Sequence, residues 1–142
     1  MAWEKYFMKL IIYTDGASRC NPGKASYGYT ISDGEGRLVH EEGKSIGIAT
    51  NNVAEYKGVL AALSWILENI KYKTQTELYA DSKLVVEQLS GRYKIKSPHL
   101  KLLIEKIQTL ALDLGGITYT HVPRSQNTKA DNLANQALDS LR

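Results

Sequence analysis

The chain has 142 residues, of which 43% are hydrophobic and 23% charged, so we expect one globular domain over residues 1–142 and exclude a disordered chain. No apolar run approaches the length of a membrane span, and residues 1–8 are too short and mixed for a secretory signal, so we expect a cytoplasmic protein. The net charge of +3 permits a polyanionic partner, and the single cysteine, Cys20, excludes an internal disulfide.

The first predicted strand, residues 9–14, runs directly into an acidic residue. Its apolar run over residues 10–12 suits a strand that is buried on both faces. Asp15 follows, and an unpaired carboxylate is costly to bury. We therefore expect Asp15 either to lie where the strand leaves the core or to meet a cation, while its neighbour Gly16 leaves a hairpin turn as the alternative.

Two more strands follow, separated by turn residues. Residues 21–23 (Asn-Pro-Gly) predict a turn, and residues 25–32 alternate as a strand does. Residues 33–36 (Asp-Gly-Glu-Gly) predict a second turn, after which residues 37–44 return as a strand. The first part of the chain is therefore predicted to be a three-stranded antiparallel meander, connected onward by residues 46–50.

From Asn51 the apolar residues recur at steps of three and four, which predicts an amphipathic helix of about five turns. The apolar positions are Val53, Tyr56, Leu60, Leu63, Leu67 and Ile70. Thr50, Asn51 and Asn52 are the candidates for its N-cap. Residues 71–75 are polar and are predicted to form a loop.

The second half of the chain alternates strands and helices. The predicted elements are a strand at 76–80, a short helix at 81–88, a helix from Pro98 to the glycines at 115–116, a strand at 117–122, a loop at 123–127 and a last helix with apolar residues between 130 and 141. Strand–helix–strand units imply parallel pairing. We therefore expect an α/β fold in which helices flank a mixed five-stranded sheet, with three antiparallel strands followed by parallel ones.

Four acids stand at the ends of these elements. Asp15 and Asp81 follow strands, and ligands of α/β sheets gather beyond the carboxyl ends of strands. Glu55 and Asp131 lie in the first turns of helices, beside the buried face. Four carboxylates brought together repel one another, and the usual relief is a hard divalent cation such as Mg²⁺ or Mn²⁺.

Each of these acids also has a purely structural interpretation. Asp81 is a candidate N-cap, and Glu55 and Asp131 follow Asn52 and Thr128 at the three-residue spacing of helix-start capping. Acids in a first turn also suit the helix dipole. Taken one at a time, these interpretations stay open, and the joint pattern favours a metal site.

Five motifs carry a resemblance to a known family. They are residues 13–18 (Tyr-Thr-Asp-Gly-Ala-Ser), 21–23 (Asn-Pro-Gly), 50–56 (Thr-Asn-Asn-Val-Ala-Glu-Tyr), 80–82 (Ala-Asp-Ser) and 121–124 (His-Val-Pro-Arg), the last followed by Asn127, Ala130-Asp131 and Leu133-Ala134. Over about residues 9–138 they resemble type 1 ribonuclease H. They are most similar to its compact bacterial and archaeal branch, which carries the His-Val-Pro-Arg version of the last strand.

The resemblance implies a ribonuclease H-like fold and a monomeric endonuclease that cuts the RNA strand of RNA–DNA hybrids, leaving 5′-phosphate and 3′-hydroxyl ends. It implies that Asp15, Glu55, Asp81 and Asp131 hold two Mg²⁺ ions, with Mn²⁺ as an alternative. In such sites one ion activates the attacking water and the other stabilises the leaving oxygen.

The resemblance also implies residues that bind the substrate. Ser18, Asn21, Asn51 and Asn52 match positions that face the minor groove of the hybrid, where 2′-hydroxyls distinguish RNA from DNA. Thr50 matches a residue that contacts a phosphate of the DNA strand. Helix capping is the structural alternative for the asparagines, and the two roles are compatible.

Two departures from the family pattern concern substrate handling. Many members carry a histidine on a flexible loop before the last helix, whereas residues 124–127 form a short segment without histidine. Arg124 is the nearest substitute and would act by charge and hydrogen bonding, since arginine does not give up its proton. The basic protrusion of longer members is missing, and Arg92, Lys94 and Lys96 either replace part of it or form a solvated basic face.

Two rival functions remain on the same residues. The first is a different nuclease of this fold, such as a resolvase or an integrase-like enzyme, which the motif at residues 50–56 and the turn at 21–23 disfavour. The second is a nucleic-acid-binding module without activity, which the presence of all four acids disfavours. Replacement of Asp15 by asparagine distinguishes an enzyme from a binding module.

Overall fold

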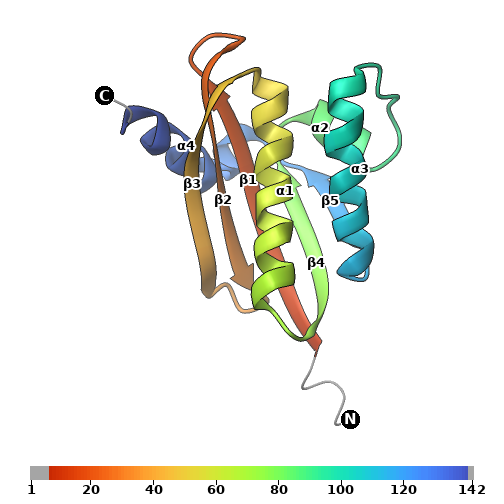
Figure 1. Cartoon of the computed structure of the whole chain (residues 1–142). Coiled ribbons are helices and arrows are strands. Elements are labelled where there is room, and N and C mark those ends of the chain that lie inside the picture. Colours follow the sequence, from red (N-terminus) through yellow and green to blue (C-terminus); the bar gives the residue numbers. More distant parts are fainter. Residues whose placement is uncertain (1–6, 141–142) are drawn as a thin grey trace.

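The structure, a computed structural model, describes residues 7–140 (Figure 1). The elements are β1 (Phe7–Ser18), β2 (Gly23–Asp33), β3 (Leu38–Ala49), α1 (Asn51–Asn69), β4 (Lys73–Ala80), α2 (Lys83–Leu89), α3 (Pro98–Asp113), β5 (Ile117–His121), a short 3₁₀-helix (Arg124–Gln126) and α4 (Thr128–Asp139). None of the described helices is long and apolar enough to cross a membrane.

The five strands form one mixed sheet, as predicted from the sequence. Their order is β3-β2-β1-β4-β5. The pairs β1–β2 and β2–β3 are antiparallel, whereas β4 runs parallel to both β1 and β5. Helices α1 and α3 cover one face of the sheet, and α4 packs on the opposite face across β1, β2 and β3 (Figure 1).

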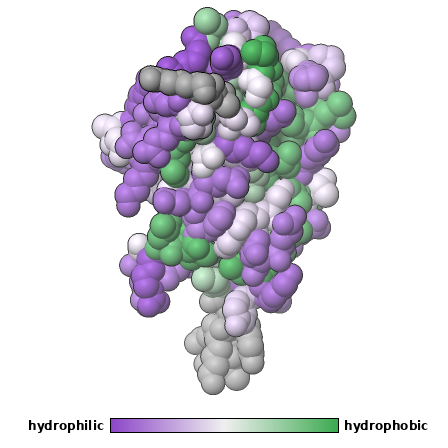
Figure 2. Space-filling model, turned by 60° about the vertical axis from the view of Figure 1, so that its left-hand side comes forward, coloured by the Kyte–Doolittle hydropathy of each residue, from purple (hydrophilic) through white to green (hydrophobic). Residues whose placement is uncertain are grey.

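The core lies between the sheet and α1. Leu10 and Ile12 of β1 are fully buried, and so are Tyr56 and Leu63 of α1. Their burial follows from the period of two on the strand and the steps of three and four on the helix. The side of the molecule that carries β3 and α4 is largely hydrophilic, with hydrophobic side chains in small separate groups (Figure 2).

Strands β1 to β4 are all longer than predicted, and two of them extend into segments predicted to be connections. β4 begins at Lys73, within the segment predicted to be a loop, because residues 73–75 pair with residues 7–9 of β1. The buried hydroxyls of Thr74 and Thr76 also bond each other, at 3.1 Å. β3 continues to Ala49, through the predicted connection at 46–50, because it keeps pairing with β2. In both places cross-strand pairing outweighs a weak apolar pattern.

The position of Asp15 differs from the prediction in one respect. The parallel ladder of β1 with β4 ends at the pair Thr14–Ala80, so Asp15 is the first residue of β1 beyond it. On its other edge β1 continues, and Asp15 pairs with Gly28 of β2. Asp15 therefore stands at the end of the parallel ladder but inside a strand, which holds its backbone more rigidly than a turn would.

Threonine or serine side chains, and not the candidate acids, cap α1, α2 and α3, while Asn127, at the N-cap of α4, makes no side-chain capping bond. The Thr50 Oγ1 accepts a hydrogen bond from the N–H of Val53 at 3.2 Å, at the start of α1. The Ser82 Oγ accepts from the N–H of Val85 at 3.3 Å, at the start of α2. The capping interpretation of Asp81 is therefore wrong, and its carboxylate is free for another role.

No helix interrupts residues 90–97, which connect α2 to α3 in the place of a basic protrusion. Arg92 in this segment forms a two-pronged ion pair with Glu87, at 2.6 and 3.0 Å. Lys94 and Lys96 are exposed. Of the three basic residues that would either replace part of the protrusion or form a solvated basic face, Arg92 is therefore already paired within the protein.

Candidate metal centre and nucleic-acid cleft

Three of the four predicted acids converge at one end of the sheet. Asp15 comes from β1, Glu55 from the first turn and a half of α1, and Asp81 from the residue after β4. One carboxylate oxygen from each lies within 4.8 Å of those of the other two. Three residues far apart in the sequence thus bring their carboxylates close enough together to hold one metal ion.

Gly16 allows this convergence. A side chain at this position would place its Cβ 2.4 Å from the backbone nitrogen of Glu55 and 2.6 Å from the carbonyl carbon of Ala54. Only glycine permits the first turn of α1 to lie this close to β1. The Asp-Gly dipeptide, which alone suggests a turn, serves here to bring α1 and Glu55 against the strand.

Burial and mutual repulsion dominate the electrostatics of the centre. Asp15 and Glu55 are only 5% and 8% exposed. Burial, then Asp131 and the charge of Asp81, raise the pKa of Asp15 to about 7. Burial and then Asp15 raise the pKa of Glu55 well above its ordinary range. The protein alone therefore disfavours full ionisation of this pair at neutral pH.

The fourth acid, Asp131, approaches from the opposite face of the sheet. It lies in the first turn of α4, and it is close enough to Asp15 to raise the pKa of that residue. It is not part of the three-acid group, and its carboxylate is 25% exposed. The Arg124 guanidinium lies 3.8 Å from it and is 82% exposed, so this predicted residue stands beside the fourth acid and not beside the first three.

The acids line a cavity of about 480 Å³. One wall comes from the end of β1 and the start of α1, and it includes three of the predicted substrate residues, Ser18, Asn51 and Asn52. The other wall holds Arg124 together with Asp131. The arrangement places neutral hydrogen-bonding groups on one side of an acidic floor and a cation on the other.

The remaining two substrate residues line a neighbouring hollow of about 360 Å³. Asn21 and Thr50 lie here, and Asn52 borders both spaces. The Asn21 Oδ1 accepts a hydrogen bond from the backbone N–H of Asn51 at 3.0 Å, which ties the turn after β1 to the start of α1. Capping is thus the observed role of Thr50, and Asn51 and Asn52 follow it inside the helix.

Asn135 lines the main cavity but lies outside the predicted set. Its Nδ2 donates to the backbone carbonyl of Asp131 at 3.0 Å. In the sequence, only its spacing points to Asn135, because a residue four positions after Asp131 on a helix lies on the same face. An amide at that spacing is common on helices, so the sequence alone did not distinguish it.

The donor atoms suit a hard divalent cation. All three converging side chains offer carboxylate oxygens, which Mg²⁺ and Mn²⁺ prefer. Within residues 7–140, no lysine or arginine forms an ion pair with these three acids. The buried Oε2 of Glu55 has no hydrogen-bond partner among the described residues. A cation would relieve both the repulsion and this unpaired oxygen.

Comparisons with known proteins agree with this site and fold. The family described as reverse transcriptase-like matches residues 13–137. The bifunctional protein Rv2228c of Mycobacterium tuberculosis is 47% identical over 135 residues, which cover 94% of this chain and 36% of that protein. The ribonuclease HI of Halobacterium salinarum is 42% identical over 127 residues, which cover 89% of this chain and 63% of that protein. The chain thus spans less than two thirds of the length of these relatives.

A solved structure extends the likeness to three dimensions. The crystal structure of LC11-RNase H1 in complex with an RNA/DNA hybrid is 40% identical and has a TM-score of 0.87. The match covers 92% of this chain and 97% of that one. Together with the mixed sheet and the acids at its end, these matches show that the chain belongs to the type 1 ribonuclease H family, in its compact form.

Proposed function

We propose that this chain is an endonuclease that hydrolyses the RNA strand of RNA–DNA hybrids and leaves 5′-phosphate and 3′-hydroxyl ends. The observation that carries the proposal is the acidic floor, where Asp15, Glu55 and Asp81 lie within 4.8 Å of one another. The hybrid bound in the LC11-RNase H1 structure supports the choice of substrate. The relatives named ribonuclease H support the reaction class.

The four acids would hold two Mg²⁺ ions, with Mn²⁺ as an alternative. Asp15, Glu55 and Asp81 supply the converging oxygens, and Asp131 would complete the set from α4. Bound divalent cations supply Lewis acidity for the attacking water and the leaving oxygen. The protein contributes a fixed geometry, because β1 and the first turn of α1 hold their acids on rigid backbone.

The cavity that the acids line and the neighbouring hollow would hold the two strands of the hybrid. Asn51 and Asn52 would bind ribose hydroxyls through their amides, which both donate and accept. Ser18 would contribute through its backbone, because its hydroxyl already donates to the carbonyl oxygen of Ala49 at 3.0 Å. The Thr50 hydroxyl accepts its capping bond from Val53, so its own proton stays free to donate to a phosphate of the DNA strand. The Nδ2 of Asn21 also donates no described hydrogen bond, so it stays free to donate to a ribose hydroxyl in the minor groove of the hybrid.

Arg124 would assist the reaction from the rim of the cavity. Its guanidinium is exposed and lies 3.8 Å from Asp131, so it faces the side on which a phosphate would approach. It would act on phosphate charge and not as a proton carrier. We further propose that the protein is a monomer and works in the cytoplasm.

A cleavage assay tests the proposal. End-labelled RNA–DNA hybrid, duplex RNA, duplex DNA and branched DNA are incubated with the protein in Mg²⁺ or Mn²⁺. We expect cleavage of the RNA strand of the hybrid alone, and none with the Asp15→Asn variant. Preferred cleavage of branched DNA would support the rival nuclease, and tight hybrid binding without cleavage would support the binding module.

A further inference from the structure

Helix α4 supplies the fourth acid but is joined to the others by no strand pairing. Asp15 and Asp81 directly follow the last pair of the β1–β4 ladder, and Glu55 is held by the contact of α1 with Gly16. Asp131 sits on the last helix, which lies on the opposite face of the sheet (Figure 1). The height of α4 above the sheet therefore decides how far Asp131 reaches toward Asp15.

Two glycines set that height. A Cβ at Gly28 would lie 2.3 Å from the carbonyl oxygen of Ala130, and a Cβ at Gly43 would lie 2.3 Å from the carbonyl oxygen of Leu133. Both obstacles are backbone atoms of α4, which cannot rotate out of the way as a side chain would. The helix backbone thus rests directly on the backbone of β2 and β3.

The two glycines occupy one row of the sheet, and that row contains the central acid. Gly28 pairs with Gly43 across β2 and β3. Gly28 also pairs with Asp15 across β2 and β1. Gly28 and Gly43, on which α4 rests, therefore lie in the same cross-strand row as Asp15, the residue that Asp131 must face. Ala130, whose carbonyl lies over Gly28, immediately precedes Asp131 in the chain.

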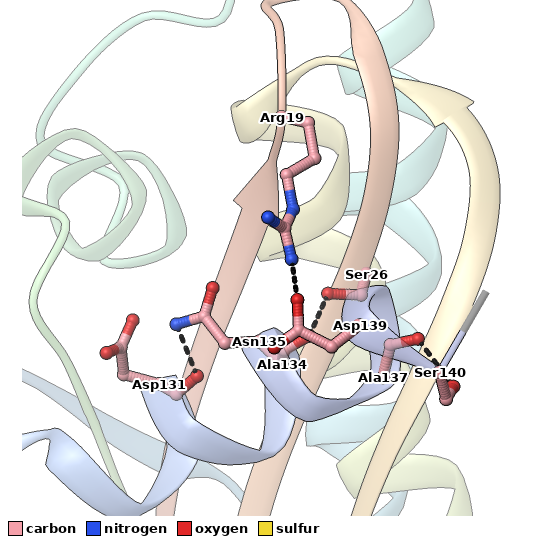
Figure 3. A network of polar contacts seen from close by, with 8 residues as sticks. All are labelled: Arg19, Ser26, Asp131, Ala134, Asn135, Ala137, Asp139 and Ser140. Carbon is pink, nitrogen blue, oxygen red and sulfur yellow. Dashed lines mark hydrogen bonds and ion pairs between the residues drawn. The ribbon is translucent and has the colours of Figure 1, made fainter. Parts of the chain in front are cut away.

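Polar contacts fix α4 along its own axis. The Asn127 Nδ2 donates to the carbonyl oxygen of Thr14 at 2.8 Å, at the N-terminal end of the helix. The Ser26 Oγ donates to the carbonyl oxygen of Ala134 at 2.5 Å, and Arg19 contacts Asp139 near the C-terminal end (Figure 3). The first two contacts also tie α4 to β1 and β2, and between them the glycine row decides how closely the helix backbone approaches the sheet.

We propose that Gly28 and Gly43 are positioning residues for Asp131: this glycine pair lets α4 approach the sheet closely enough for Asp131 to join the acids around Asp15. The proposal rests on the proposed function, in which Asp131 is a metal ligand. A Cβ needs about 3.4 Å to an ordinary neighbour, so alanine at either position would lift α4 by roughly 1 Å. Residues that orient metal ligands typically contribute about 10–100-fold to metal affinity or activity.

The test compares Gly28→Ala and Gly43→Ala with Gly34→Ala as a matched control. Gly34 lies in an exposed turn, where the nearest atom to a Cβ would be the Lys9 Cβ, at 3.2 Å, and not the backbone of α4. Mg²⁺ binding is measured by calorimetry and hybrid cleavage by initial rates. We expect about 10–100-fold weaker Mg²⁺ binding and slower cleavage for the first two variants, and no change for the control.

A double-mutant cycle with Asp131→Asn distinguishes positioning from general damage. If the glycines act through Asp131, Gly28→Ala loses its effect on Mg²⁺ affinity once Asp131 is replaced. An equal loss with and without Asp131, or unchanged Mg²⁺ affinity in both alanine variants, would overturn the proposal. Calorimetry needs no activity, so a protein that binds Mg²⁺ through Asp131 but cuts no hybrid would refute the proposed function and leave this inference intact.

Folding is checked by circular dichroism before either measurement. β3 is an edge strand, so Gly43→Ala can relax by an outward movement of β3, whereas β2 is held between β3 and β1 and Gly28→Ala cannot relax in this way. If Gly28→Ala fails to fold, the cycle is carried out with Gly43→Ala, whose expected effect is smaller but of the same sign. A folded Gly43→Ala variant with the Mg²⁺ affinity of the wild type would then overturn the proposal.

Discussion

Asp15 and Asp33 are each followed by glycine, yet their surroundings are opposite. The Asp33 carboxylate accepts three hydrogen bonds, from the backbone N–H groups of Glu35 and Arg37 and from the Arg37 guanidinium, at 2.9, 3.0 and 3.0 Å. Asp15 accepts one described hydrogen bond, from the N–H of Gly16 at 3.0 Å. One carboxylate is surrounded by donors, whereas the other is surrounded by further acids.

The pKa values record this difference. Hydrogen bonds from Arg37 and its neighbours lower the pKa of Asp33. Burial and the other acids raise the pKa of Asp15 from 3.8 to about 7. The charge of Asp33 therefore stabilises the fold, and that of Asp15 opposes it. An acid that the protein leaves unsatisfied is available to a ligand, which is the usual physical mark of a functional site.

The largest expected effect comes from removing the unsatisfied charge. Asp15→Asn should reduce hybrid cleavage on the order of 10³-fold or more, because the amide lacks the negative charge and the second oxygen with which Asp15 would hold the cations. In EDTA the same variant should melt about 3 °C or more above the wild type, since it removes repulsion with Glu55 and Asp81. Initial rates and thermal unfolding measure the two effects. A variant that is both inactive and less stable would contradict this account of Asp15.

Metal binding should remove the destabilising effect of the Asp15 charge, which is what distinguishes it from the charge of Asp33. A cation held by Asp15, Glu55 and Asp81 offsets their repulsion, and at about 100 times its Kd it stabilises a fold by about 2.7 kcal/mol. We therefore expect Mg²⁺ to raise the melting temperature of the wild type and to have little effect on Asp15→Asn. NaCl at matched ionic strength is the control. Equal stabilisation of both proteins would place the bound ion elsewhere.

The dependence of stability on pH should have opposite signs at the two sites. A carboxyl whose folded pKa lies near 7 and whose ordinary value is 3.8 binds more protons in the folded state between these values. The stability of the metal-free protein therefore falls as the pH rises through this range. The lowered pKa of Asp33 works the other way, and its contribution is lost only as the pH falls below the ordinary range.

Thermal unfolding in EDTA between pH 5.5 and 8.5 checks this expectation. The wild type should melt at a lower temperature at the upper end of the range. Asp15→Asn should show a shallower dependence, and some slope should remain because burial also raises the pKa of Glu55. Asp33→Asn should keep the wild-type slope. If Asp15→Asn keeps the full wild-type slope, Asp15 is not the titrating group.

Much of the fold followed from residue patterns, because periods of two and of three to four are imposed by burial on one face. The sheet composition and the order of elements were predicted for this reason. The extents of the strands were not, since they depend on what the partner strand offers. Residues 73–75 extend β4 because they pair with residues 7–9 of β1, and no apolar pattern in this polar segment predicts that pairing.

The candidate site divides in the same way. The acids were recognisable because they stand at the ends of elements, where a sheet gathers ligands. The glycines that position these acids were not recognisable, because they act through the absence of a side chain. Gly16, Gly28 and Gly43 matter by the backbone atoms that come close to them, and those atoms belong to helices distant in the sequence. A single sequence gives no pattern for such contacts.

The smallest expected effect lies at the satisfied aspartate. Asp33→Asn keeps an oxygen for the N–H groups of Glu35 and Arg37 and loses only the ion pair, in which the Arg37 side chain is 74% exposed. Asp33→Ala loses the acceptors as well. We therefore expect a melting temperature slightly below that of the wild type for the first variant and a larger decrease for the second.

Hybrid cleavage should be unchanged, within about twofold, in both Asp33 variants, since neither replacement reaches the acid cluster. Strand β2 is the one structural connection between Asp33 and the acid cluster that this experiment must exclude. It pairs Asp33 with Leu10 at one end of β1, and Gly28 with Asp15 toward the other end. If the turn at Asp33 held β2 in register, Asp33→Ala would shift Gly28 and with it α4. Slower cleavage with weaker Mg²⁺ binding in Asp33→Ala, but not in Asp33→Asn, would then make the turn part of the support for Asp131.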